Sequence, residues 1–363
     1  MPSTMLSIHS RKGSTPQASR AKLRSAKRKK FWTILTVVGA PLAAAGGFAY
    51  YRYRRDLGAA EARVSSGSTL IETACGLIEY ADVGAGAPVL VIHGAGGGFD
   101  QGLDVARPFL DHGFRVIAPS RFGYLRSPIP ADASPMAQAD AYACLLDRLQ
   151  VGKVVVYGVS AGGPSAVQLC LRHPERCAAL VLGVPLAYSD QSANTRPAQR
   201  SALTGRVINA TISSDFAFWA MSKLARDTTI RTILGTPPEE VANATPDEQA
   251  RIAQMLDHIQ PISRRKNGLR NEAAVVQSLG RYDLELLTVP ALVFSVENDG
   301  YKTYAGAKYT AEHIKGGRFV GYPTGGHLLV GHQQEVWSEI MEFLKNSGCL
   351  HEQETPLETR AIR

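Results

Sequence analysis

The stretch from Lys153 to Gly163, KVVVYGVSAGG, constrains the fold more than any other part of the chain. Its first half is an apolar, β-branched run that predicts a buried strand, and its second half contains Gly-x-Ser-x-Gly with Ser160 at the centre. The residues that follow, Pro164 to Leu171, predict a helix. A serine on a tight strand-to-helix turn, flanked by glycines that allow close approach, is a candidate nucleophile. The competing interpretation is a glycine-rich turn in which Ser160 only caps the helix, and the pentapeptide alone does not exclude it.

Strand-like and helix-like segments alternate along the rest of the chain. The predicted strands are residues 70–73, 76–83, 88–93, 115–119, 178–185, 289–296 and 318–322, and the predicted helices are 135–149, 304–314 and 335–344. Parallel strands need crossover helices, so this alternation predicts an α/β fold with a doubly wound, mostly parallel sheet covered on both faces. In such a sheet, the catalytic side chains lie at the carboxyl ends of the strands.

Residues 186–288 differ in character from the alternating segments and have a helical pattern. We interpret them as an insertion between two parts of one core, residues 65–185 and 289–346. The insertion contains an aromatic group, which either packs in its interior or lines an apolar pocket, and a basic run, which either lies on a solvated helix face or attracts an anionic substrate or lipid headgroups. These are Phe216, Phe218 and Trp219, and Arg264, Arg265, Lys266 and Arg270. The polar residues 347–363 predict a disordered tail.

A serine hydroxyl needs a base within hydrogen-bond reach, and the base needs a third group to orient it. His327 is the candidate base, because it follows two glycines in a loop between the last strand and the last helix. Asp299, after the strand at 289–296, is the candidate acid, with Glu297 as the alternative. The other nearby histidines, His313 and His332, fall on or next to helices. The chain order Ser160, Asp299, His327 is the one expected for a nucleophile on such a turn.

An acyl-transfer site also needs backbone N–H donors for the oxyanion. Ala161, directly after the candidate nucleophile, supplies one donor, and Ala95 or Gly96 supplies the other from the glycine-rich loop at 94–98. The same loop could instead hold a phosphate, but it lacks both the GK[ST] ending of a P-loop and the spacing of GxGxxG. We therefore expect an oxyanion hole at this loop and no nucleotide cofactor.

Taken together, HGAGGG at 93–98, GVSAG at 158–162, the acid after the penultimate strand and GGH at 325–327 resemble the α/β-hydrolase superfamily, in its single-domain serine esterase and lactonase-like branch. The resemblance covers about residues 70–344. It implies an eight-stranded sheet, with residues 186–288 forming a helical cap over the site. Ser120 departs from the pattern, because many members have Asp at that position. Since the position lies outside the triad, the departure bears on the subfamily rather than on catalysis.

The N-terminus carries most of the positive charge. Residues 1–55 hold twelve of the 40 Lys and Arg residues and no Asp or Glu, so the net charge of +8 belongs to this segment and gives no reason to expect nucleic-acid binding. Residues 1–30 predict a disordered basic arm, and the 21 uncharged residues 31–51 predict one membrane-spanning helix. Positive charge before the span places the N-terminus in the cytoplasm and the catalytic domain on the opposite face. Cleavage, with a secreted or organellar product, is the alternative.

The five cysteines, Cys75, Cys144, Cys170, Cys177 and Cys349, show neither CxxC nor paired-histidine spacing. The spacing therefore predicts neither a disulfide framework nor a metal site, and we expect Cys170 and Cys177 to be small core residues.

The sequence thus predicts a membrane-anchored serine hydrolase that acts without a cofactor on a small-molecule ester, thioester or lactone. Two alternatives stay open. The same triad could hydrolyse a carbon–carbon bond or transfer an acyl group, or the chain could be a non-catalytic binding protein on a hydrolase scaffold. The residues give no oligomeric state and no substrate contacts.

Overall fold

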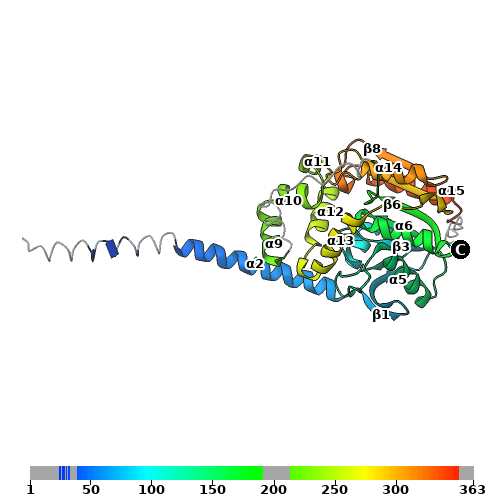
Figure 1. The fold of residues 1–363 in the computed structure, drawn as a ribbon. Helices are drawn as coiled ribbons and strands as arrows, with labels where there is room; N and C mark the ends of the chain where they lie inside the picture. The colour runs from blue at the N-terminus through cyan, green and yellow to red at the C-terminus, as the bar shows by residue number, and fades with distance from the viewer. Residues whose placement is uncertain are drawn as a thin grey trace, which may run out of the picture. The chain divides into compact units, whose positions relative to one another are not determined.

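The computed structural model describes residues 39–190 and 213–350, together with positions 24, 25, 27, 28, 30 and 32. The chain divides into two compact units, Met1–Asp56 and Leu57–Arg363. Helix α2 (Ala40–Ser65) begins in the first unit and ends in the second. The second unit contains the sheet and all later helices (Figure 1).

The described residues give the predicted membrane span no support. None of their helices is both long enough and apolar enough to cross a bilayer. Helix α2 continues past the expected end of the span at Tyr51 through charged residues at 52 and 54–56. Positions 31 and 33–38 of the span lie outside the described residues, as do most of the basic arm at 1–30 and residues 351–363 of the tail.

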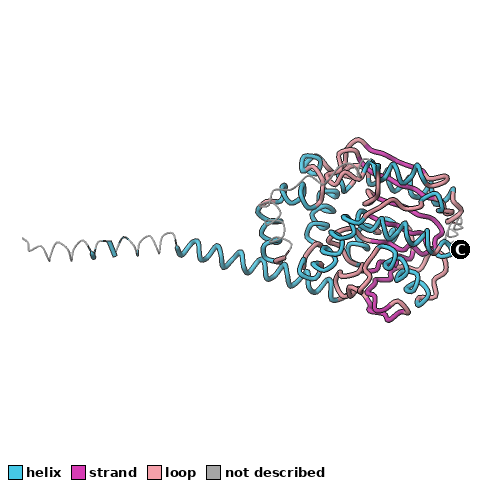
Figure 2. The backbone as a smooth tube through the Cα atoms, viewed as in Figure 1, coloured by secondary structure: helices cyan, strands magenta, loops and turns pink. Residues whose placement is uncertain are grey.

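The sheet of the second unit has eight strands in the order β1-β2-β4-β3-β5-β6-β7-β8. Strand β2 pairs antiparallel with β1 and β4, and the remaining neighbours are parallel, which confirms the predicted mostly parallel, eight-stranded sheet. Figure 2 shows the strands in magenta and the helices in cyan. The strands are β1 (Thr69–Thr73), β2 (Gly76–Val83), β3 (Pro88–Ile92), β4 (Arg115–Pro119), β5 (Val154–Val159), β6 (Cys177–Gly183), β7 (Ala291–Val296) and β8 (Arg318–Tyr322).

Both faces of the sheet are covered, and the apolar runs of the central strands supply both cores. Alternate residues point to opposite faces of a strand. In β3, Leu90 and Ile92 therefore pack into one core, while Val89 and Val91 pack into the other. The first core lies under α5 (Pro135–Arg148), α6 (Gly163–Arg172) and α14 (Tyr304–His313), and the second lies under α3 (Phe99–Val105), α4 (Arg107–Asp111) and α15 (Gln333–Asn346).

The described part of the predicted cap is helical and has an apolar core of its own. Phe218 is buried in this core, whereas its neighbour Phe216 is largely exposed. The cap helices are α9 (Asp215–Leu224), α10 (Arg226–Ile233), α11 (Pro238–Asn243), α12 (Pro246–Asp257) and α13 (Lys266–Ser278). Two short 3-10 turns, η4 (Ile262–Arg264) and η5 (Leu284–Leu286), also lie within the described part of the cap. The 3-10 turns η2 (Ser160–Gly162), η3 (Pro174–Arg176) and η6 (Gly326–Leu328) lie in the core. The aromatic group thus contributes Phe218 to the cap interior, while residues 191–212 lie outside the described part.

A buried ionic cluster around Asp100 joins the cap to the core. The guanidinium of Arg265, which is fully buried, donates to both carboxylate oxygens of Asp100 at 3.1 and 2.7 Å and to the carbonyl of Ile259 at 3.0 Å. Arg63, near the end of α2, donates to the same carboxylate at 3.2 Å and to the carbonyl of His258 at 3.2 Å. One carboxylate therefore links α2, the first turn of α3 and the start of α13.

This cluster shows that one residue of the basic run at 264–270 does not lie on a solvated helix face. Arg264 and Arg270 are exposed, as a solvated face requires, but Arg265 is not. This difference could not be predicted from the residue pattern, because the partner Asp100 lies 165 residues earlier in the chain.

The structure also corrects the expectation of no disulfides, because it contains two, while Cys170 and Cys177 are buried in the core as predicted. Cys75, in the β1–β2 turn, pairs with Cys144 on α5, and Cys170 on α6 pairs with Cys177 at the start of β6. The Cα atoms of the two pairs lie 5.9 and 5.3 Å apart, within the range that a disulfide bridges. Spacing alone could not reveal the first pair, since 69 residues separate its members and only the packing of α5 brings them together.

We predict that Arg265→Met lowers the free energy of unfolding by about 3 kcal/mol, because removing one partner of a buried ion pair leaves the other charge poorly compensated. Urea denaturation measures this change. Arg107→Met is the matched control, since its pair with Asp111 is exposed and such pairs contribute little. Equal, small effects of the two substitutions would contradict the assignment of Asp100 as the link between cap and core.

Candidate active site

Ser160 lies on a sharp turn between β5 and α6, where the sequence predicts a strand-to-helix elbow. Its backbone has a φ of 52°, in the left-handed region that non-glycine residues rarely adopt. The flanking glycines are sterically required. A Cβ on Gly158 would lie 2.5 Å from the Cβ of Ala166, and a Cβ on Gly162 would lie 2.4 Å from the carbonyl oxygen of Ile92. Close packing of β5, α6 and β3 thus holds the serine in a strained conformation.

His327 reaches Ser160 from the loop between β8 and α15. Its Nε2 lies 2.8 Å from Ser160 Oγ, and its Nδ1 lies 2.8 Å from Asp299 Oδ2. Because a carboxylate accepts, Nδ1 carries the proton and Nε2 is the atom that can accept the serine proton. The three residues predicted from sequence therefore form one continuous hydrogen-bonded chain.

Asp299, which follows β7, is fully buried and held from three sides. The backbone N–H of Tyr301 donates to Oδ1 at 2.7 Å, and the hydroxyl of Thr303 donates to Oδ2. Burial alone raises the pKa of Asp299, but His327 and these hydrogen bonds outweigh it and hold the pKa below its usual value. The carboxylate therefore stays ionised and keeps the imidazole oriented.

The alternatives considered from sequence lie elsewhere. Glu297 is exposed, whereas Asp299 is the acid that contacts the imidazole. His332 pairs with Glu335 at 2.8 Å, and the Nδ1–H of His313 donates to the carbonyl of Tyr309 on its own helix. None of these three side chains takes part in the chain from Ser160 to Asp299.

The two loops expected to supply oxyanion donors border the serine. A cavity of about 280 Å³ contains Ser160 and is lined by Ala95 and Ala161, but not by Gly96. The backbone N–H of Gly96 instead donates to the hydroxyl of Tyr124 at 3.3 Å. Of the two residues proposed for the second donor, the geometry therefore favours Ala95.

His93 and Tyr124 hold this loop in place. The Nδ1–H of His93 donates to the carbonyl of Gly94 at 2.7 Å, and its Nε2 accepts the backbone N–H of Arg121 at 3.0 Å. Burial, together with nearby Arg121, holds the pKa of His93 well below its ordinary value. The ring is therefore neutral, as both hydrogen bonds require.

A second buried ion pair connects the loop after β4 to the cap. Arg121 donates to Glu272 of α13 at 2.6 Å and to the carbonyl of His93 at 3.3 Å. The side chain of Glu272 also lines the cavity around Ser160. Arg121, Tyr124 and Glu272 are not among the site residues predicted from sequence. The sequence offers one weak indication, because Arg121 and Tyr124 follow the carboxyl end of the strand predicted at 115–119, where functional residues of such sheets commonly lie.

Ser120, which departs from the family pattern, has a structural role. Its hydroxyl donates to buried Glu79 at 2.8 Å and accepts the backbone N–H of Phe99 at 3.0 Å. The same carboxylate accepts from Arg126 at 2.6 Å. These contacts connect β2, the end of β4 and the start of α3, and none of them involves Ser160, His327 or Asp299.

The cavity around Ser160, which we call the serine cavity, is mainly apolar. Besides His327 and Tyr301, Glu272 is the one ionisable side chain among the described residues that line it, and Lys and Arg are absent from this lining. Apolar lining comes mainly from the cap and includes Ile233, Leu234, Met255, Ile259 and Val276. Across the described part of the chain, no group of three or more His, Cys, Asp or Glu is placed to hold a metal ion.

Comparison with known proteins finds a matching family. Residues 87–331 match the family described as alpha/beta hydrolase fold. An uncharacterized hydrolase, YcgS, from Bacillus subtilis (strain 168) is 25% identical over 287 residues, which is 75% of this chain and 96% of that protein. A 2-hydroxymuconate semialdehyde hydrolase from Pseudomonas sp. (strain CF600) is 39% identical over 105 residues, 28% of this chain and 37% of that protein.

A solved structure gives a further comparison. A thermophilic esterase from Thermogutta terrifontis is 26% identical, with a TM-score of 0.55, and the match covers 78% of this chain and 99% of the esterase.

We predict that Gly158→Ala destabilises the fold by about 1–3 kcal/mol, because its new Cβ overlaps that of Ala166. Urea denaturation of Gly158→Ala, Ala166→Gly and the double variant measures the coupling. The double variant should lose less stability than the sum of the single losses, because Ala166→Gly removes the overlapping atom. Gly152→Ala is the control, since a Cβ there would meet nothing within 4 Å. Additive losses would show that this contact does not shape the elbow.

Proposed function

We propose that this chain, which belongs to the alpha/beta hydrolase fold family, is a serine hydrolase that cleaves a neutral carboxylic ester, thioester or lactone through an acyl-enzyme. One observation carries the proposal: the hydrogen-bonded chain Ser160–His327–Asp299, with 2.8 Å at each of its two steps, beside a cavity of ligand size. This arrangement has the geometry that nucleophilic catalysis by serine requires.

The reaction would proceed in two halves. Ser160 Oγ forms a bond to the substrate carbonyl carbon while His327 Nε2 accepts the hydroxyl proton, and the carbonyl electron pair moves onto the oxygen. The N–H groups of Ala95 and Ala161 would bind this oxyanion. When the carbonyl reforms, the bond to the leaving group breaks and His327 donates its proton to that group. Water then repeats the sequence on the acyl-enzyme, with His327 as base, and releases the acid.

The lining of the serine cavity favours a neutral acyl group. A carboxylate in the substrate would meet Glu272, which is already paired with Arg121, and no lysine or arginine among the described lining residues. Burying such a charge without a partner is costly. The similarity to a thermophilic esterase over most of both chains supports ester hydrolysis.

A fluorophosphonate tests the nucleophile, because it reacts covalently with activated serines. We expect the probe to label the wild-type protein and to leave Ser160→Ala unlabelled. Ser165→Ala is the matched control, since this serine lies five residues away and its hydroxyl donates to the carbonyl of Gly162. Labelling that persists in Ser160→Ala would reject the assignment. Failure to label the wild type would favour a non-catalytic binding protein.

Carbon–carbon bond hydrolysis by the same three residues is the second candidate, because part of the chain is 39% identical to a 2-hydroxymuconate semialdehyde hydrolase. Hydrolysis of a neutral ester and of 2-hydroxymuconate semialdehyde by the same preparation separates the two. The serine cavity favours the ester. Faster turnover of the anionic semialdehyde would establish the second candidate instead, and transfer of the acyl group to an added alcohol would indicate an acyltransferase.

We also propose that the N-terminal segment anchors the protein in a membrane, with the N-terminus in the cytoplasm and the catalytic unit on the opposite face. The charge distribution supports this proposal, since positively charged residues flank the 21 uncharged residues at 31–51 on both sides. After washing of membranes at alkaline pH, the full chain should stay in the pellet. Its release into the supernatant would reject the anchor, and a shortened N-terminus on the isolated protein would indicate a cleaved signal instead.

A further inference from the structure

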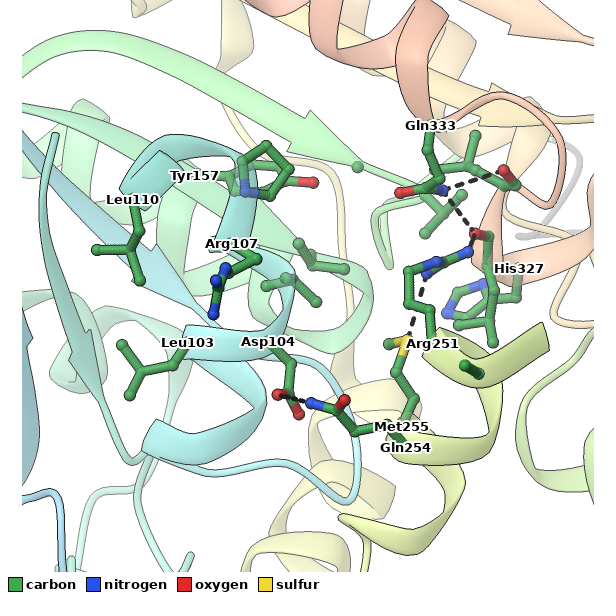
Figure 3. Close-up of a pocket in the computed structure, with 18 of the residues that line it drawn as sticks. Leu103, Asp104, Arg107, Leu110, Tyr157, Arg251, Gln254, Met255, His327 and Gln333 are labelled. Carbon is green, nitrogen blue, oxygen red and sulfur yellow. Dashed lines mark hydrogen bonds between the residues drawn. The ribbon is translucent and has the colours of Figure 1, made fainter. Parts of the chain in front are cut away.

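A second, larger cavity of about 690 Å³ lies between α3–α4 and the cap helix α12. We call it the distal groove; residues within 103–110, 247–255 and 327–333 line most of it. In Figure 3, the side chain of Asp104 on α3 points toward that of Gln254 on α12. The amide of Gln254 donates to Asp104 at 2.8 Å and joins the two walls.

The distal groove meets the serine cavity at the catalytic histidine. Five residues line both spaces: Val105, Val159, Met255, His327 and Leu328. Ser160, Ala95 and Ala161, in contrast, line the serine cavity and are not among the described residues that line the groove. The groove is thus the space beside His327 that lies away from the serine and the candidate oxyanion donors.

We propose that the distal groove binds the leaving-group half of the substrate, while the serine cavity binds the acyl half. This inference rests on the proposed function. In acyl transfer the oxyanion must face the N–H donors, whereas the departing oxygen must face His327 Nε2 to receive its proton. The acyl carbon bonds to Ser160, so the acyl chain lies with Ser160 in the smaller space. The alcohol leaves on the histidine side, where the groove begins.

The lining of the groove indicates the chemistry of that alcohol. Leu110 and Val184 contribute apolar surface. Gln254 and Gln333 contribute amide oxygens that can accept hydrogen bonds, because the amide nitrogen of Gln254 already donates to Asp104 and that of Gln333 to the carbonyls of Leu328 and Leu329. A ligand that fits this mixture has an apolar body and hydroxyl or amide groups.

Charge argues for a neutral leaving group. Arg107 donates to Asp111 at 2.9 Å and Arg251 donates to Glu248 at 2.8 Å, so each arginine that lines the groove already has a carboxylate partner. Among the described lining residues, Asp104 and Asp247 add negative charge. An anionic leaving group would therefore have to compete with Asp111 or Glu248 for either arginine.

The volumes of the two spaces indicate the relative sizes of the acyl part and the alcohol part of the substrate. About 280 Å³ holds a short or medium acyl chain, and about 690 Å³ holds a much larger alcohol. The inferred substrate class is therefore a short-chain or medium-chain acyl ester of a bulky, uncharged alcohol that carries amide or hydroxyl groups.

Four esters test this division with the full-length chain. Ethyl acetate is the reference, the acetate of N-benzoylethanolamine enlarges the alcohol with an amide, the acetate of 4-phenylbutanol enlarges it without one, and ethyl decanoate enlarges the acyl chain. We expect kcat/KM to be about tenfold higher for the amide-bearing acetate than for ethyl acetate, since filling a specific pocket contributes factors of this size.

Two variants test whether the distal groove causes the expected preference for the larger alcohol. Ala250→Trp places an indole in the groove from an exposed position on α12, and it should lower the ratio of kcat/KM for the amide-bearing acetate to that for ethyl acetate about tenfold. Ala242→Trp is the matched control, because Ala242 is exposed on cap helix α11 and lines neither cavity. Gln254→Leu should lower the ratio between the amide-bearing acetate and the phenylbutyl acetate.

The outcomes distinguish failure of the leaving-group assignment from failure of the proposed hydrolase function. An unchanged alcohol ratio in Ala250→Trp, or a selective loss of ethyl decanoate hydrolysis, would overturn the assignment of the groove while leaving the proposed hydrolase intact. Hydrolysis of ethyl acetate by the wild type but not by Ser160→Ala reports on the hydrolase itself. Without any Ser160-dependent ester hydrolysis, the proposed function fails, and the leaving-group assignment fails with it.

Discussion

The left-handed backbone of Ser160 is the constraint on which the rest of the site depends. Its φ of 52° is maintained because β5, β3 and α6 approach each other so closely that Gly158 and Gly162 leave no room for a Cβ. Such a conformation costs free energy, and it persists where surrounding packing determines it. The sheet therefore does more than support the site: it aims the serine hydroxyl at His327, and both lie at the carboxyl ends of parallel strands.

Much of this could be predicted from the sequence because the signals are local. An apolar β-branched run before Gly-x-Ser-x-Gly predicts the strand and the turn, and glycine-containing loops after later strands predict where His327 and Asp299 lie. The alternation of strands and helices then implies that all three meet at one edge of the sheet. Choosing Asp299 over Glu297 needed no long-range information beyond this, although only the structure shows that the first is buried and the second exposed.

The remaining features depend on contacts between distant segments, which composition and spacing do not encode. Arg265 sits in a run that looks solvated, yet it is buried against Asp100, and Glu272 of the cap meets Arg121 of the core. The disulfide between Cys75 and Cys144 likewise depends on where α5 packs. These long-range pairs join the cap and the core, and residues of both line the serine cavity and the distal groove.

The central claim is that Ser160 carries the acyl group between the two halves of the reaction. Rapid acid quenching of the protein with an acetate ester, followed by mass spectrometry of its peptides, tests this claim most directly. The account predicts one acetyl group on the peptide that contains Ser160, formed as the alcohol is released. Release of alcohol with no acetyl group on that peptide, or with the acetyl group on another residue, would contradict it.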